Sequence, residues 1–440
     1  MRCSLILRSL VVTEKAKSRI NDIILSALGR LVAGGTLAAE PLPAFTVETP
    51  ANSDNGDFSC NVALVSAKTL KLPPRSIAEL IKGEISLSGT VFDRVEIAGP
   101  GFINFFVGEK WYGEAVSGII AADGDYGKTD LGAGRRVLIE FVSANPTGPM
   151  HIGNARGGAT GDCLASLLQY AGFYVEREFY VNDAGNQIEK FGLSLDIRYR
   201  GELGEDVEIP EEAYKGEDIT ERAKAFIAER GDGYLNAPEA ERRKALVDYA
   251  LPINIKGLEE DLLKYRIKYD NWFRESALHK NGSAMKVVEL LRKKGHTYEK
   301  DGATWFKASE FGNDKDIVLI RGSGIPTYIV ADIAYHYNKL VERGFDTAID
   351  ILGADHHGYV PRMNAALTAL GIDASRLKVI IVQMVRLVRA GETVKLSKRS
   401  GKAITLNSLL DEVPTDAARF FFNLRDANTH LDFDLDLAIE

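Results

Sequence analysis

Hydrophobic and polar positions in the middle of the chain predict a β-α-β unit. Residues 137–142 are mostly apolar or β-branched and follow a Gly-Ala-Gly break, as is typical of a buried strand. From Ala155 the apolar residues recur at helical spacing as far as Gly172, a natural left-handed cap, and residues 173–180 are typical of a second strand. The loop 143–154 therefore follows the carboxyl end of the first strand, the edge at which open α/β sheets bind ligands.

The same patterns divide the chain into three predicted parts. Residues 1–112 alternate short helices and strands and predict a small α+β domain. Residues 113–400 predict an α/β fold with a doubly wound parallel sheet, interrupted by a charged helical insertion at about 188–300. Residues 401–440 form a third, short C-terminal part. After the insertion, apolar runs continue the predicted sheet at 317–320, 348–352 and 379–388.

Composition narrows the classes of protein to which the chain can belong. The 440 residues are 45% hydrophobic and carry a net charge of -8, which argues against a polycation that coats nucleic acid but allows local basic patches. Cys3, Cys60 and Cys163 are too few and too scattered for a zinc site or a disulfide framework. The sequence has no signal-peptide or membrane-span pattern, so we expect a cytoplasmic protein.

The loop before the predicted helix carries candidate chemistry. His151 and Asn154 lie three residues apart as the chain enters the helix, so both can point toward a helix N-terminus, which favours phosphate. Gly153 removes a side chain that would keep a nucleotide away from the backbone. A structural turn with a hydrogen-bonded histidine explains the same residues, and the loop alone does not decide between these interpretations.

Two later segments carry polar groups of other kinds. Tyr328 and Asp332 lie four apart on one predicted helix face, where a carboxylate beside a phenol suits a guanidinium or an amine; a surface acid is the alternative. His356 and His357 follow an aspartate and suggest a metal site at first sight. Adjacent residues point apart and no third ligand cluster accompanies them, so we expect nucleotide contact there and no metal site.

Two motifs together resemble a known family. Ser-Ala-Asn-Pro-Thr-Gly-Pro followed by His-Ile-Gly-Asn at 151–154 resembles the first signature of class I aminoacyl-tRNA synthetases, in particular the arginyl-tRNA synthetases. Lys-Leu-Ser-Lys-Arg at 395–399 resembles the second signature, although a solvated loop has a similar composition. Asn154 replaces the usual second histidine; its amide can donate a hydrogen bond but cannot become cationic. The runs at 56–63 and 98–105 resemble the N-terminal domain of arginyl-tRNA synthetases, which contacts the outer corner of tRNA in that family.

The resemblance implies a Rossmann-type class I fold and a set of roles. It implies ATP with Mg²⁺, L-arginine and tRNA(Arg) as substrates, and we expect a monomer. A central expectation is that His151 and Lys398 face one another across an ATP-sized crevice. The implied residues are catalytic His151, Asn154, Lys395 and Lys398; ATP-binding Gly148, Gly153, Gly353, Asp355 and His356; and arginine-binding Glu140, Asn145, Tyr328 and Asp332.

Two rival interpretations and one departure accompany this resemblance. The rivals are a class I synthetase for another amino acid and a non-catalytic RNA-binding relative that kept the fold. Residues 416–437 resemble the stem that leads into an anticodon-binding domain, and the sequence stops at Glu440. We therefore expect most of that domain to be missing from this sequence, which puts anticodon recognition in doubt.

Overall fold

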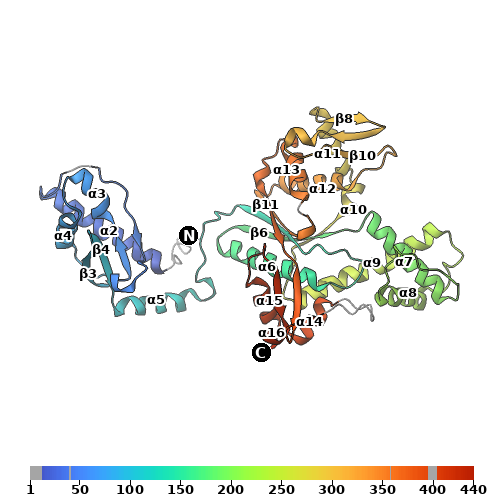
Figure 1. The fold of residues 1–440 in the computed structure, drawn as a ribbon, viewed down its shortest axis with the longest axis horizontal. Coiled ribbons are helices and arrows are strands. Elements are labelled where there is room, and N and C mark those ends of the chain that lie inside the picture. Colours follow the sequence, from blue (N-terminus) through green and yellow to red (C-terminus); the bar gives the residue numbers. More distant parts are fainter. Residues whose placement is uncertain (1–11, 39–40, 357, 395–403) are drawn as a thin grey trace. The chain divides into compact units, whose positions relative to one another are not determined.

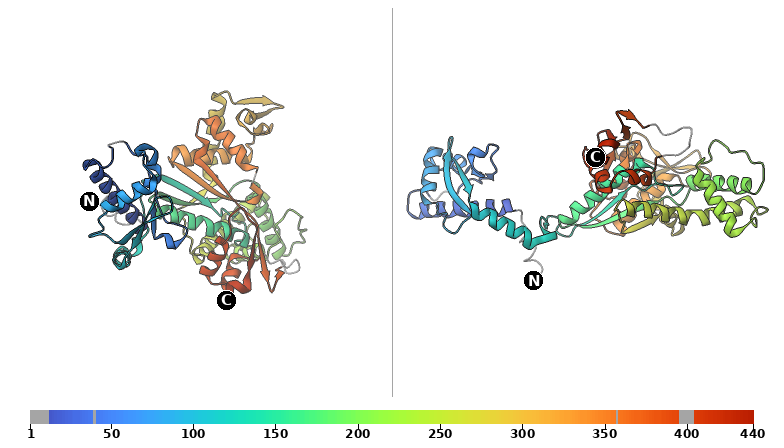
Figure 2. Two further views of the ribbon diagram at one scale, coloured as in Figure 1. Left: turned by 60° about the vertical axis from the view of Figure 1, so that its left-hand side comes forward. Right: turned by 90° about the horizontal axis from the view of Figure 1, so that it is seen from below.

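The structure is a computed structural model that describes residues 12–38, 41–356, 358–394 and 404–440. The chain divides into two units, Met1–Leu131 and Gly132–Glu440, drawn in Figures 1 and 2. Each unit has its own hydrophobic core. The domain boundaries predicted from the sequence, at 112 and 400, remain predictions.

The first unit packs helices against one antiparallel sheet. The strand order is β1-β2-β4-β3, and the apolar positions of two helices supply fully buried residues such as Ile20, Ile24 and Ile77. Gly101 (φ +141°) turns the β3–β4 hairpin, and a Cβ atom there would lie 2.9 Å from the Pro74 backbone. The elements are α2 (Val12–Ala33), β1 (Val47–Glu48), η2 (Ser53–Asn55), β2 (Phe58–Cys60), α3 (Val62–Leu70), α4 (Pro74–Glu84), β3 (Phe92–Ala98), β4 (Phe102–Val107), α5 (Glu109–Ala122) and η3 (Asp123–Asp125).

A five-stranded parallel sheet organises the second unit. Its strand order is β12-β11-β5-β6-β7, so the order reverses between the neighbours β5 and β11. Their carboxyl ends form the switch point at which doubly wound sheets bind ligands. This confirms the predicted α/β fold class. The strands are β5 (Arg136–Phe141), β6 (Tyr174–Val181), β7 (Asn271–Arg274), β11 (Thr347–Gly353) and β12 (Leu377–Val382).

Helices cover both faces of this sheet. Helix α6 (Ala155–Tyr170) packs against the face that carries Ile139 and Phe141. It approaches closely because it lacks a side chain at Gly161, where a Cβ atom would lie 2.3 Å from Cγ of Phe141. Gly172 has a φ of +85°, as its predicted role as a left-handed cap requires. Helices α12 (Tyr328–Tyr337) and α13 (Tyr359–Leu370) share a second core with Ala348 and Leu377.

Three helices form the insertion between β6 and β7, and they have a small core of their own around Phe191, Tyr199 and Phe226. These helices are α7 (Asn186–Glu202), α8 (Glu217–Arg230) and α9 (Glu239–Lys264). The prediction extended the insertion to about residue 300, whereas the chain returns to the sheet at β7. A four-residue strand is too short to leave a clear alternating pattern.

The run at 317–320 was wrongly predicted to continue the main sheet. It forms β10 (Ile317–Ile320) in a separate antiparallel sheet of order β10-β9-β8. An apolar run specifies a strand but not its partners. The neighbouring elements are α10 (Glu275–Lys280), α11 (Ser283–Lys293), β8 (Thr297–Lys300), β9 (Ala303–Phe306), η5 (Ala308–Phe311) and the π-helical turn η6 (Asn338–Glu342).

The single strand predicted at 379–388 is two strands in different sheets, β12 and β13 (Val385–Arg389). The C-terminal segment causes the break, because Gln383 N donates to Ala427 O and Leu431 N donates to Met384 O. Strand β13 then pairs with β15 (Leu431–Asp434) and β14 (Glu392–Thr393). The remaining elements are η7 (Ala354–His356), η8 (Ala374–Arg376), α14 (Leu406–Glu412), α15 (Thr415–Asn423) and α16 (Leu435–Ile439).

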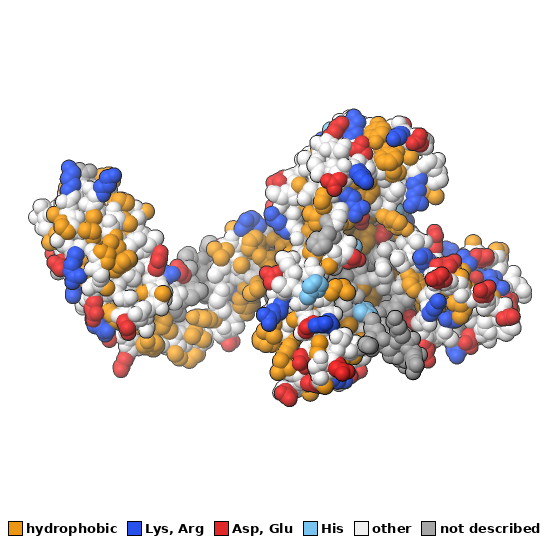
Figure 3. All heavy atoms as spheres, in the orientation of Figure 1, with side chains coloured by type: hydrophobic (Ala, Val, Ile, Leu, Met, Phe, Trp, Pro, Cys, Tyr) orange, Lys and Arg blue, Asp and Glu red, His pale blue; other side chains and the backbone are white. Residues whose placement is uncertain are grey.

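Basic and acidic side chains are interspersed on the face of the molecule shown in Figure 3. Within the described part of the chain, no helix is long and apolar enough to cross a membrane.

Candidate active site

The loop between β5 and α6 begins with a strained turn. Val142 (φ 68°) and Ser143 (φ 42°) both adopt left-handed backbone conformations, which are unfavourable for a β-branched residue such as Val142. Ser143 Oγ donates to Glu140 Oε1 at 2.9 Å and accepts from Tyr180 N at 3.1 Å. These hydrogen bonds stabilise the strained backbone conformation. Strained residues held in this way often occur at functional sites.

A cavity of about 580 Å³ lies at the switch point of the sheet. The carboxyl ends of β5 and β11, the loop after β5, and residues of β6, α12 and α13 surround it. We call it the first cavity. Its lining includes Glu140, Ser143, Asn145, His151, Asn154, Tyr180, Asn182, Gln187, Asp332, Tyr335, Asp350, Gly353, Asp355, His356 and Tyr359.

His151 lines this cavity, and a hydrogen bond defines the tautomer of its neutral ring. Its Nδ1 accepts a hydrogen bond from Gly153 N at 3.0 Å, so the proton of the neutral ring lies on Nε2. Partial burial lowers the pKa of His151 and favours the neutral form. Asn154 lines the same cavity at the start of α6. The two residues can therefore act as hydrogen-bond donors beside a helix N-terminus.

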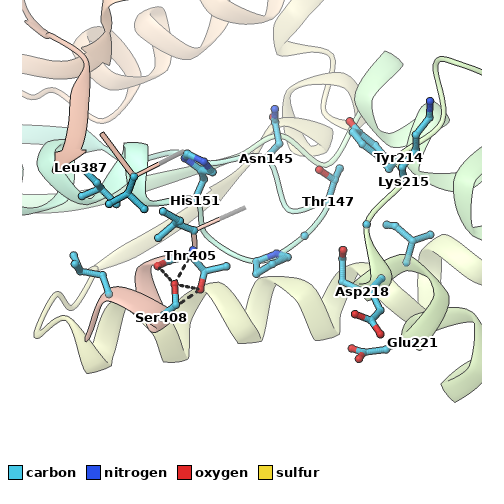
Figure 4. Close-up of a pocket in the computed structure, with 18 of the residues that line it drawn as sticks. Asn145, Thr147, His151, Tyr214, Lys215, Asp218, Glu221, Leu387, Thr405 and Ser408 are labelled. Atoms are coloured by element: carbon cyan, nitrogen blue, oxygen red, sulfur yellow. Dashed lines mark hydrogen bonds between the residues drawn. The ribbon is translucent and has the colours of Figure 1, made fainter. Parts of the chain in front are cut away.

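A larger hollow of about 960 Å³ lies on the other side of the same loop. Figure 4 shows Asn145, Thr147 and His151 of the loop between Tyr214, Asp218 and Glu221 of the insertion and Leu387, Thr405 and Ser408 from the end of the chain. We call it the second cavity. Asn145, Pro149 and His151 line both cavities, so the loop separates two adjoining spaces.

The residues that flank the second predicted motif lie against the first one. Ile152 N donates to Ile404 O at 3.1 Å, and Leu406 N donates to Met150 O at 2.9 Å. Val394 and Ile404 both line the second cavity. Lys395 and Lys398 lie outside the described residues, so the expected pairing of His151 with Lys398 stays a prediction.

The residues predicted to bind arginine are only partly brought together. Glu140, Asn145 and Asp332 line the first cavity. Tyr328 does not line it, and its side chain is 58% exposed beside Gly185. Both carboxylate oxygens of Glu140 already accept hydrogen bonds, one from Ser143 and one from Lys339.

Asp332 is chemically distinct among the acids of the first cavity. Among the described residues its carboxylate takes part in no hydrogen bond or ion pair. Protein atoms surround it except toward the cavity, and this burial raises the pKa of Asp332 to about 7. An incompletely matched carboxylate of this kind suits a cationic ligand group.

Four of the five residues predicted to bind ATP line one of the two cavities. Gly353, Asp355 and His356 line the first cavity and Gly148 lines the second. Gly153 lines neither cavity, but its amide orients the ring of His151. The side chain of Asp355 is 83% exposed, so it is accessible to a polar ligand group.

Several site residues were not identified from the sequence. Lys339, His336 and Asp350 form a buried cluster beside the first cavity. The sequence pattern placed Asp350 in a buried strand and did not single out Lys339. Tyr214 and Asp218 belong to the insertion, to which the sequence assigned no chemistry. Tyr214 OH donates to Oε1 of Gln187, a residue of α7 that lines the first cavity.

The fold and the loop motif define the catalytic domain of a class I aminoacyl-tRNA synthetase. Residues 115–430 match the family model described as tRNA synthetases class I (R), catalytic domain, and residues 18–107 match that of the arginyl tRNA synthetase N terminal domain. The chain belongs to the arginyl-tRNA synthetase family.

Relatives of known name support this assignment. The chain is 53% identical to the arginine–tRNA ligase of Caldanaerobacter subterraneus subsp. tengcongensis over 97% of its own length and 76% of that protein. It is 52% identical to the arginine–tRNA ligase of Acetivibrio thermocellus over 98% of this chain and 76% of that protein. The solved Thermus thermophilus arginyl-tRNA synthetase has the same fold, with a TM-score of 0.61 at 18% identity over 96% of this chain and 78% of that one.

Proposed function

We propose that this chain is an arginine–tRNA ligase, which activates L-arginine with ATP and transfers the arginyl group to the 3′ end of tRNA(Arg). Two curated relatives named as arginine–tRNA ligases match 97% and 98% of the chain. The observation in the site that best supports arginine as the substrate is Asp332, a surrounded carboxylate with no partner among the described residues.

In the first step, the arginine carboxylate attacks the α-phosphorus of ATP in line. A new C–O–P linkage forms, the bond from the α-phosphorus to the bridging oxygen breaks, and pyrophosphate leaves. Negative charge grows on the phosphoryl oxygens, and pre-oriented donors that meet it lower the barrier. His151 Nε2–H and the Asn154 amide would supply two such donors at the start of α6. Lys395 and Lys398 would supply cations; their role rests on the sequence motif.

The arginine side chain would enter the first cavity. Asp332 would receive the guanidinium, and Glu140 and Asn145 would complete the wall around the substrate. The role of Tyr328 rests on the resemblance alone, because its side chain lies outside the cavity lining. Holding both substrates in one geometry contributes much of the rate.

ATP would lie between the loop and the end of β11, against Gly148, Gly153, Gly353, Asp355 and His356. Among the described residues no group of three His, Cys, Asp or Glu side chains could hold a metal ion. Mg²⁺ would bind mainly through the phosphates of ATP, as it usually does.

In the second step, a ribose hydroxyl at the 3′ end of the tRNA attacks the arginyl carbonyl, and AMP leaves. We propose that residues 1–112 contact the outer corner of the tRNA, because residues 18–107 match the N-terminal domain of this family. In the proposed division, residues 113–400 form the catalytic domain and residues 401–440 form the stem. We further propose a monomer that acts in the cytoplasm.

Arginine-dependent AMP formation tests the function directly. We expect the purified chain, with ATP, Mg²⁺ and total tRNA, to form AMP and charged tRNA with arginine and with none of the other standard amino acids. Activity with another amino acid would support a class I synthetase of different specificity. ATP binding without turnover for any amino acid would support a non-catalytic relative.

Substitutions in the two motifs test the proposed roles. We expect His151→Ala and Lys398→Ala each to slow single-turnover adenylate formation on the order of 100-fold, the usual effect of removing one donor to a developing charge. The dissociation constant for arginine should stay nearly unchanged. The control His430→Ala changes an exposed histidine and should leave the rate intact. Unaltered adenylate formation in either variant would refute that residue's role.

A further inference from the structure

A lysine lies fully buried behind the first cavity. Lys339, in η6, is 0% exposed. Its ammonium lies 2.6 Å from Oε2 of Glu140, 2.8 Å from Oδ1 of Asp350 and 4.0 Å from the ring centroid of Tyr335. Because an unmatched ammonium is costly to bury, these partners account for its presence in the core.

The two carboxylate partners of Lys339 lie directly opposite one another in the sheet. Asp350 of β11 is the register partner of Glu140 of β5, and both line the first cavity. Like charges directly opposite on neighbouring strands repel one another. The ammonium of Lys339 bridges them, so it joins the two strands that form the switch point.

Other contacts satisfy the remaining carboxylate oxygens of these two acids. Ring Nε2 of His336 lies 2.7 Å from Asp350 Oδ2, and Ser143 donates to Glu140. Glu178 of β6 lies nearby but has its own partners, Tyr335 OH at 2.6 Å and Arg343 Nη1 at 2.6 Å. Lys339 is therefore committed to Glu140 and Asp350.

We propose that Lys339 is a positioning residue for the amino-acid substrate. It holds Glu140 and Asp350 side by side against their repulsion, and it leaves Asp332 as the surrounded acid whose charge the substrate must match. A surrounded, unmatched negative charge in the cavity selects a side chain that carries a positive charge. This inference rests on the proposed function, and it adds a specificity role for a residue that does not touch the substrate.

Removing the ammonium while keeping the side-chain volume tests the proposal. We expect Lys339→Met to weaken arginine binding by about tenfold or more, because two facing carboxylates lose their shared cation. ATP binding should change by less than about twofold, since the contacts described for Lys339 are with Glu140, Asp350 and Tyr335, none of which is a proposed ATP-binding residue. Titration calorimetry measures both dissociation constants. The control Lys378→Met changes an exposed lysine of β12 and should alter neither.

Charge rescue separates this role from simple packing. In the double variant Lys339→Met/Asp350→Asn, one repelling carboxylate is gone, so arginine binding should return to within about threefold of that of Asp350→Asn alone. Wild-type arginine affinity in Lys339→Met would overturn the inference. A double variant that binds arginine no more tightly than Lys339→Met would also overturn it.

Folding and function are controlled separately. If Lys339→Met does not fold, a folded double variant that binds arginine supports the inference, and a double variant that also fails to fold overturns it. Arginine binding by the wild-type chain is measured first. If the wild type binds no arginine, the proposed function itself fails, which is distinguishable from a failure confined to Lys339.

Discussion

Burial and neighbouring charges together set the pKa of Asp332. Burial raises its pKa to about 7; His336 opposes this, Glu275 and Glu140 add to it, and Arg362 opposes it weakly. A bound guanidinium would favour the ionised form and lower the pKa again. Arginine binding should therefore release a proton near neutral pH, because the carboxyl group must ionise to pair with the ligand.

The sign of this linkage predicts how arginine affinity depends on pH. Below pH 7 the protonated form dominates and must lose its proton before it binds, so affinity should rise about tenfold from pH 6 to pH 8 and then level off. In Asp332→Asn, binding should be weaker on the order of 100-fold and this pH dependence should disappear. Calorimetry across this pH range checks both. The exposed Asp314→Asn should behave as the wild type, and a flat wild-type profile would contradict the assignment.

The position of His151 and Asn154 at the start of a helix could be predicted from the sequence. The burial of Lys339 beside Glu140 and Asp350 could not. His151 and Asn154 stand next to a predicted helix start, and local spacing was enough to place them there. Lys339 meets Glu140, 199 residues away along the chain. Its burial depends on tertiary contacts, so no local pattern distinguishes it from a surface lysine.

Among the elements, the β5–α6–β6 unit was predicted correctly because each part has a strong period of its own. The break between β12 and β13 was missed because it depends on hydrogen bonds from residues 427–431. Arg156 of α6 is 0% exposed and stabilises the same segment. Its guanidinium donates hydrogen bonds to the carbonyl oxygens of Gln383, Arg425, Asp426 and Thr429. Pairing with distant segments overrides what a single stretch of sequence indicates.

Two glycines of α6 allow a matched test of its packing. A Cβ atom on Gly161 would lie 2.3 Å from Phe141, whereas one on Gly157 would lie 3.9 Å from Ile351. We expect Gly161→Ala to destabilise the second unit by about 1–3 kcal/mol through overpacking. Gly157→Ala should be neutral or stabilise it by up to about 1 kcal/mol, since alanine favours a helix. Urea unfolding measures both, and equal effects would contradict the close approach of α6 to β5.

On the scale of the whole molecule, each of the two units has hydrophobic cores of its own. The core of the first unit contains Ile20, Ile24 and Phe105, and the cores of the second unit contain residues from 137 onward. The residues of the proposed arginine site all belong to the second unit. Separate cores should unfold in separate transitions, since each unit has its own cooperative set of contacts.

Arginine and a core substitution should therefore act on different transitions. Arginine at about 100 times its dissociation constant should stabilise the second unit by about 2.7 kcal/mol and leave the first unaffected. Ile24→Ala truncates a 0% exposed side chain of the first unit and should destabilise that unit alone by about 2–5 kcal/mol. Differential scanning calorimetry follows both transitions, with and without arginine. A single transition that both changes shift together would show that the units unfold as one, and a loss of arginine binding in Ile24→Ala would show that the first unit supports the site.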